Sequence, residues 1–150
     1  MSRAKARNIA MLIAYSQIFN LPYNEDSFSA PYEIVYKKEL GEEILFSEKF
    51  LEEKKYIDEV VTGIKNNTSK IDTLISKYLV NWTLEKLAKV DLAILRLAVY
   101  EMLFVNIPVN VSIGEAMKMA QSFSSPQNAR FINGVLGSIS RDALVVEAKK

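Results

Sequence analysis

The chain has 150 residues, of which 49% are hydrophobic and 25% charged, and its formal net charge is +1. This balance is typical of a globular protein, predicts a single domain over residues 1–150, and argues against an intrinsically disordered chain. The absence of Cys and His excludes disulfides, Cys–His nucleophiles and the usual zinc ligands, so we expect no metal and no cofactor.

The first predicted helix runs from Ser2 to Asn20, and it ends because Pro22 disfavours helical geometry in the residue before it. Helical spacing predicts that its inward face carries Ile9, Leu12, Ser16 and Phe19, with Ile13 and Tyr15 beside them. The pattern over residues 24–47 is less clear, and we predict there a helix that Pro31 opens and Gly41 ends.

Two amphipathic helices are predicted in the middle of the chain. The first ends at Asn66-Asn67, and its buried stripe is predicted to be Phe50, Ile57, Val60, Val61 and Ile64. The second is predicted to be capped by Thr68 or Ser69 and to bury Ile71, Leu74, Ile75, Tyr78 and Leu79. Residues 81–83 form a break, with Thr83 as the N-cap of a short turn through Leu84 and Leu87.

The last third of the chain is the most apolar. Residues 90–105 are apolar on nearly every side, which predicts the central, buried helix. A helix over 111–123 is predicted to turn Ile113, Ala116, Met117 and Ala120 inward. Ser125 and Pro126 cap and open a last helix that is predicted to bury Phe131, Val135 and Ile139. We therefore predict an all-α bundle of about seven helices.

Sequence signals for catalysis are missing. There is no Gly-rich phosphate loop, no HExxH and no nucleophile elbow, so we do not expect an enzyme. No apolar run reaches the ~18–20 residues that span a bilayer, and the default expectation is a cytoplasmic protein without a membrane partner.

The basic opening is a candidate polyanion contact. Arg3, Lys5 and Arg7 are followed by no acid within the first 24 residues, and cations at a helix N-terminus are unfavourable for the helix dipole. A bound polyanion would compensate them. The alternative is a solvated, frayed tail.

Two further groups of residues each allow two interpretations. Arg130 and Phe131 could contact a phosphate and stack on a base, although the pattern around Phe131 alone favours a core residue. Asp91, Arg96 and Glu101 interrupt the most apolar helix, where charges should be paired internally or should face a partner.

Three motifs in the second half resemble the NusB family: KVDLAILRLAVYEMLF, IPVNVSIGEAMKMAQSF and ARFINGVLGSI. The opening Ala6-Arg7, Ala10 and Tyr15 also resembles the start of that family, and the likeness covers nearly the whole chain. Two departures are Asn8, where the family has Glu, and Gly114 inside a helix, which weakens that helix by about 1 kcal/mol relative to Ala.

The resemblance implies an all-helical protein built as two packed three-helix-like halves. It implies a transcription antitermination factor that binds boxA RNA together with NusE, a small-subunit ribosomal protein, and joins RNA polymerase elongation complexes, notably on ribosomal RNA operons. It also allows a homodimer of the free protein. By resemblance, Arg3, Lys5, Arg7, Arg130 and Phe131 contact RNA. By the same resemblance, Tyr15, Glu85 and Asp91 lie at or near the partner surface.

Two other functions remain open from the sequence. One is a helical protein-interaction adaptor that does not bind RNA. The other is a detached NusB-like domain of the kind fused to RNA cytosine methyltransferases, although nothing in this chain supplies the methyltransferase.

Overall fold

The computed structural model describes residues 2–19 and 48–150, and the predicted helix between Pro31 and Gly41 lies outside them. The described residues form seven α-helices and one short 3-10 helix, without a strand, so the all-α prediction is confirmed. They divide into two compact units, residues 1–63 and 64–150. No helix in these ranges combines the length and the apolar character that crossing a membrane requires.

The first unit contains α1 (Arg3–Ile18) and most of α3 (Glu48–Asn66). Ser2 caps α1 by accepting a hydrogen bond from the Lys5 backbone N–H at 3.2 Å. The predicted inward face of α1 is correct at Ile9 and wrong at Phe19, which is 52% exposed. The residues that α1 buries are Ala6, Arg7, Ile9, Ala10, Met11, Ile13 and Ala14. Three of them are alanines, which a search for large apolar side chains overlooks.

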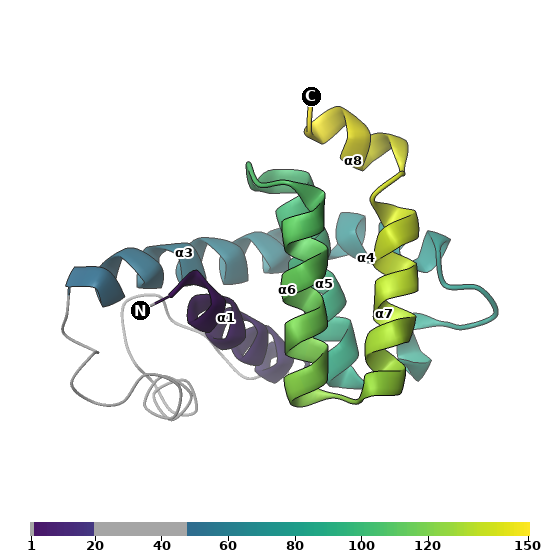
Figure 1. Ribbon diagram of the computed structural model, residues 1–150, viewed down its shortest axis with the longest axis horizontal. Helices are drawn as coiled ribbons and strands as arrows, with labels where there is room; N and C mark the ends of the chain where they lie inside the picture. Colours follow the sequence, from purple (N-terminus) through teal and green to yellow (C-terminus); the bar gives the residue numbers. More distant parts are fainter. Residues whose placement is uncertain (1, 20–47) are drawn as a thin grey trace. The chain divides into compact units, whose positions relative to one another are not determined.

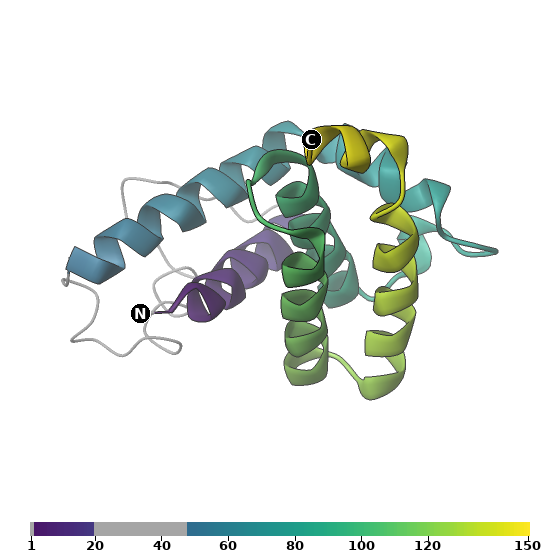
Figure 2. The same ribbon diagram turned by 45° about the horizontal axis from the view of Figure 1, so that its top comes forward.

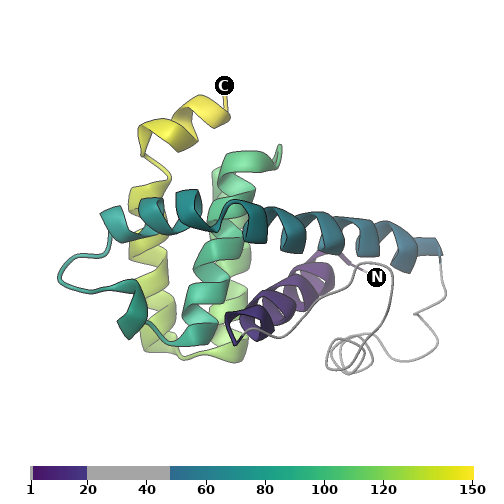
Figure 3. The ribbon, with the colours of Figure 1, turned by 180° about the vertical axis from the view of Figure 1, so that it is seen from behind.

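The second unit is built around α5 (Lys89–Phe104), whose buried residues lie on nearly every side, as predicted. α6 (Val109–Phe123) and α7 (Pro126–Ile139) pack against it and against each other (Figure 1). The short α8 (Ala143–Ala148), which the sequence did not predict, turns back against α5 (Figure 2). Seen from behind, α4 (Thr68–Lys77) lies across α5 and α7 (Figure 3).

The buried faces of α4 and α6 follow the predicted spacing in part. α4 buries Ile71, Leu74 and Ile75 as predicted. α6 buries Ala116 and Ala120 as predicted, but Ile113 and Met117 are only partly covered, and Ser112 and Met119 are buried instead. The inward face of α6 is therefore rotated slightly from the predicted one.

The predicted N-cap of α7 is confirmed, and the predicted N-cap of α4 is wrong. Ser125 caps α7 by accepting from the Asn128 backbone N–H at 3.0 Å, and Pro126 occupies the first turn, as predicted. The expected cap of α4 by Thr68 or Ser69 is wrong, because Asn67 is its N-cap. The Thr68 hydroxyl instead donates to the carbonyl of Ile64 at 2.7 Å.

The Arg96 charge of α5 is paired with an acid of α4. Arg96 donates from Nε and Nη2 to the two carboxylate oxygens of Asp72, at 2.9 and 2.8 Å, which joins α5 to α4. This confirms the internal pairing of Arg96 and is the bidentate geometry in which Arg–carboxylate pairs are strongest.

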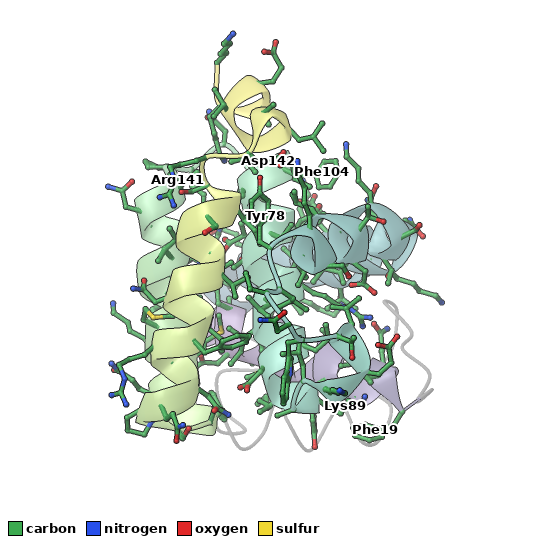
Figure 4. The ribbon with its side chains drawn as sticks, turned by 90° about the vertical axis from the view of Figure 1, so that its right-hand side faces the viewer. Phe19, Tyr78, Lys89, Phe104, Arg141 and Asp142 are labelled. Carbon is green, nitrogen blue, oxygen red and sulfur yellow. The ribbon has the colours of Figure 1, made fainter. Side chains whose placement is uncertain are left out.

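A polar cluster around Asp142 lies near the C-terminal end of α5 (Figure 4). Asp142 Oδ2 accepts from Lys77 Nζ at 2.8 Å and from the Tyr78 hydroxyl at 2.6 Å, and Oδ1 caps α8 through the Leu144 backbone N–H at 2.9 Å. The hydrogen bond from Lys77, then those from Tyr78 and Leu144, lower the pKa of Asp142 from 3.8 to about 2. The cluster fastens α8 to the end of α4.

Candidate nucleic-acid interface

The basic opening is held by α1, but its three cations lie in different environments. Arg3 Nε donates to Glu53 Oε2 of α3 at 2.8 Å, and its guanidinium lies 4.0 Å from the ring centroid of Tyr56. The acid that the first 24 residues lack is therefore supplied from 50 residues away. The Arg3 side chain nevertheless remains 46% exposed, so its outer face can still contact an anion.

Lys5 and Arg7 differ in access. The Lys5 side chain is exposed and makes no ion pair with any described residue. Arg7 is only 6% exposed and interacts within the protein. Of the three predicted RNA contacts at this end of the chain, Lys5 and Arg3 are therefore presented to a ligand and Arg7 is not. Tyr15, predicted at the partner surface, is half-buried on the same helix and contacts Phe19 edge-on at 5.2 Å.

A cavity of about 500 Å³ lies in the second unit, where α5 and α7 begin. Its volume falls in the range of ~300–1,000 Å³ that is usual for small-ligand pockets. The lining residues come from four segments: the loop after α4, the short helix η2 (Leu84–Lys86) with the residues after it, the first turn of α5, and the start of α7. Two residues predicted from the sequence, Asp91 and Phe131, line it together.

Asp91 lines this cavity as a buried carboxylate and is not an exposed charge. It is 3% exposed, in the first turn of α5, where a negative charge favours the helix dipole. Its Oδ2 accepts from Asn128 Nδ2 at 2.9 Å, which links the starts of α5 and α7, and Oδ1 has no hydrogen-bond partner among the described residues. Asn128 also donates to the Ser124 hydroxyl at 3.1 Å. These hydrogen bonds connect the start of α5 to the start of α7.

Exposed aromatic side chains line the same cavity. Phe131 is 38% exposed and Trp82 is 47% exposed, so the prediction that Phe131 is a core residue is wrong. Lys86 Nζ lies 5.7 Å from the ring centroid of Trp82 and forms no ion pair with the described residues. A cation beside exposed rings is the combination by which proteins hold single-stranded nucleic acid without reading its sequence.

The local electrostatics at the cavity favour an anion. The first turn of α7, which supplies Gln127 and Asn128, contains no acid of its own, and the carboxylate bonded to it is the buried Asp91. Arg130 is exposed on the first turns of α7, next in the chain to Phe131. Glu85 is exposed on η2 and is not part of the lining.

The sequence missed Trp82 and Lys86. The segment 81–83 was interpreted only as a break, and the structure does place Asn81 there with a φ of 57°, a left-handed conformation that Asn tolerates better than most residues. Thr83 occupies the N-cap position of η2 as predicted but makes no side-chain cap bond. The signal that could have found the site is an isolated Trp in a polar turn, four residues before a Lys.

Comparison with known proteins gives one family. The sequence profile of the NusB family matches residues 4–141. The transcription antitermination protein NusB of Clostridium botulinum is 36% identical over 142 residues, covering 93% of this chain and 99% of that protein. The protein of the same name from Bacillus licheniformis is 49% identical over 88 residues, 58% of this chain and 68% of that protein.

Solved structures have the same fold. A NusB structure from T. maritima has a TM-score of 0.75 and 32% identity, and the match covers 99% of this chain and 96% of that chain. A crystal structure of the antitermination factors NusB and NusE in complex with dsRNA has a TM-score of 0.70 over 91% of this chain and 94% of that one. At 21% identity, the second likeness shows the fold alone.

Proposed function

The chain belongs to the NusB family of transcription antitermination proteins, which are not enzymes, and we propose that it binds single-stranded RNA of the boxA type jointly with NusE. The observation that carries the proposal is the cavity lined by Phe131, Trp82 and Lys86, where exposed rings meet a cation that forms no ion pair with the described residues. Arg130 is exposed beside it, and Lys5 and Arg3 are exposed on α1. We assign phosphate contacts to these exposed cations.

The partner follows from the charge of the chain. A net charge of +1 is low for a dedicated nucleic-acid binder, which is usually strongly basic. A few exposed cations give only modest RNA affinity, so a basic partner docked beside them is needed for tight binding. The solved NusB–NusE complex with dsRNA supports NusE as that partner. On this chain, Tyr15, Glu85 and Asp91 are proposed for the partner surface, with Glu85 the exposed charge among them.

The cellular role follows from family membership. We propose that the RNA-bound pair joins RNA polymerase elongation complexes in the cytoplasm and acts on ribosomal RNA operons. Residues 1–150 would then serve as a single RNA-binding domain, and the free chain would form a homodimer.

The direct test is RNA selectivity of the pair. The full chain is mixed with NusE and titrated with a single-stranded boxA oligonucleotide, a scrambled single strand and a duplex of the same length, with affinities measured by filter binding. We expect the boxA strand to bind most tightly and the duplex to compete poorly. Equal affinity for all three would contradict single-strand recognition, and no RNA binding by the pair would favour a protein-interaction adaptor.

A further inference from the structure

Resting on the proposed function, we propose that Trp82 is a second stacking residue, which together with Phe131 holds one nucleobase of the RNA in the cavity, while Lys86 neutralises the adjoining phosphate. Trp82 and Lys86 lie outside the three sequence motifs quoted above, although within the residues 4–141 that the family profile matches. The assignment comes from the cavity that they share with Phe131.

The exposure of the Trp82 and Phe131 rings indicates a binding site. Tryptophan and phenylalanine bury large apolar areas in a folded protein, and here both remain 38–47% exposed at one cavity of about 500 Å³. Val80, at the rim of the same cavity, is 81% exposed. An apolar surface left open in this way is the usual mark of a binding site.

Charge selects the ligand. Lys86 already lies beside the Trp82 ring, so a second cation, such as an arginine side chain of a protein partner, would be repelled there. Asp91, the acid of the cavity, is 3% exposed and already accepts a hydrogen bond from Asn128. A flat, apolar group attached to an anion satisfies these conditions, and a nucleotide is such a group.

The molecule contains a matched control for this site. Lys70 Nζ lies 5.3 Å from the ring centroid of Phe104, which is 44% exposed, so the same pair of groups occurs away from the proposed site. Lys70 lines a different cavity, and the Phe104 ring is not part of that lining. Phe104 ends α5, whereas the cavity lies where α5 begins, about 22 Å away along a helix of this length. Figure 4 labels Lys89 and Phe104, which mark these two ends.

The first experiment uses Trp82 as its own probe, because it is the only tryptophan of the chain. The full chain with NusE is titrated with a 12-nucleotide single-stranded boxA RNA, and the emission of a Trp82→Phe chain with NusE is subtracted at each point. We expect the RNA to quench the Trp82 signal. An oligomer of abasic nucleotides with the same number of phosphates should not quench it. No quenching by RNA, or equal quenching by both oligomers, would overturn the stacking role.

The second experiment measures RNA affinity of variants. Trp82→Leu should weaken binding about 5- to 100-fold, the range that corresponds to one lost base stack, whereas Trp82→Phe should retain most of it. Lys86→Gln should reduce the slope of log affinity against log salt by about 0.7. The control variants Phe104→Leu and Lys70→Gln should change neither quantity.

The outcomes separate this inference from the proposed function. Native RNA affinity of Trp82→Leu with weakened binding of Phe131→Leu would leave the RNA site in place and overturn the role of Trp82. Native affinity of both would remove the RNA site from this cavity altogether. A Trp82→Leu chain that binds RNA normally but loses affinity for NusE would assign the cavity to the protein partner instead. Because Trp82 is half-exposed, the circular-dichroism spectrum of each variant should remain native.

Discussion

The two ends of α5 differ in how completely the polar groups around them are hydrogen-bonded. At the C-terminal end, Lys149 Nζ donates to the carbonyls of Val105 at 2.6 Å and Glu101 at 3.2 Å, and Asp142 uses both oxygens to join α4 to α8. At the N-terminal end, Ala88 provides no side-chain cap and Asp91 Oδ1 has no partner among the described residues. The polar groups named at the C-terminal end are hydrogen-bonded internally, whereas at the N-terminal end one buried carboxylate oxygen is not.

This difference separates stability from binding. Hydrogen bonds that close the C-terminal end hold the last helix in place and leave few groups for a ligand. At the N-terminal end, exposed rings and a cation that forms no ion pair with the described residues contribute little to folding and remain accessible to a ligand. Variants at the first end should therefore change the free energy of unfolding, and variants at the second should change affinity.

The largest expected effect on stability is that of Asp142→Asn. The variant keeps the shape of the side chain but loses the charge that receives hydrogen bonds from Lys77 and Tyr78. Charged hydrogen bonds contribute roughly 1.5–3 kcal/mol, and Lys77 is largely solvated, so we expect a loss of about 2 kcal/mol in chemical denaturation. RNA affinity of the folded chain should stay unchanged. A marked loss of RNA affinity would contradict the separation of the two ends.

Acid should remove the same contribution. The pKa of Asp142 is lowered from 3.8 to about 2, so its carboxylate stabilises the fold above pH 3.8, and this stabilisation is lost as the pH falls through about 2. The melting temperatures of the native chain and Asp142→Asn, measured between pH 2 and pH 6, should differ most at the upper end and converge at the lower. A constant difference over this range would rule out the ionised carboxylate as its source.

The variant Phe131→Leu tests the cavity at the N-terminal end of α5. Stacking contributes ~1–3 kcal/mol per base, so RNA affinity should fall by about 5- to 100-fold. Because the ring is 38% exposed, stability should change by no more than about 1 kcal/mol. A chain that binds RNA normally but melts far lower would mean that Phe131 serves packing alone.

Lys149→Met should have a smaller effect on stability, confined to the C-terminal end of α5. It removes two hydrogen bonds to the last carbonyls of α5 and a cation that favours the helix dipole there. We expect a loss of about 1 kcal/mol in the free energy of unfolding, seen by denaturant titration. Faster hydrogen exchange should be limited to α8 and the end of α5, and exchange that spreads to the start of α5 would show that the two ends are coupled.

Asp91→Asn should have the smallest effect on stability. The charge supports the start of α5 by about 0.3–1 kcal/mol and accepts from Asn128, and an amide oxygen can accept the same bond. If Asp91 belongs to the partner surface, calorimetric titration should show a larger loss in affinity for NusE than in stability. Native affinity for NusE would limit Asp91 to a structural role.

Local patterns were sufficient for much of the fold. The apolar character of residues 90–105 predicted the central helix, and Ser125 with Pro126 predicted the start of α7 to the residue. The short α8 was missed because its N-cap, Asp142, is held by Lys77 and Tyr78, which lie 64–65 residues earlier in the chain. No local pattern contains such a contact.

The candidate site was predictable only in part for the same reason. Phe131 and Asp91 were singled out, but that they line one cavity depends on how α5 and α7 begin side by side. The pairing of Arg3 with Glu53 and the burial of Arg7 also depend on contacts distant in the chain, so charge counting alone treated three unlike cations as equal.

The central claim is that this chain holds RNA weakly alone and tightly with NusE, and RNA affinity across a salt series tests it most directly. Three to five phosphate contacts predict a slope of log affinity against log salt of about −2 to −3.5 for the chain alone. The mixture with NusE should bind more tightly with a steeper slope, and RNA must strengthen the contact between the two proteins by the same factor. A mixture that binds no better than two independent proteins, with the slope unchanged, would contradict a shared RNA surface.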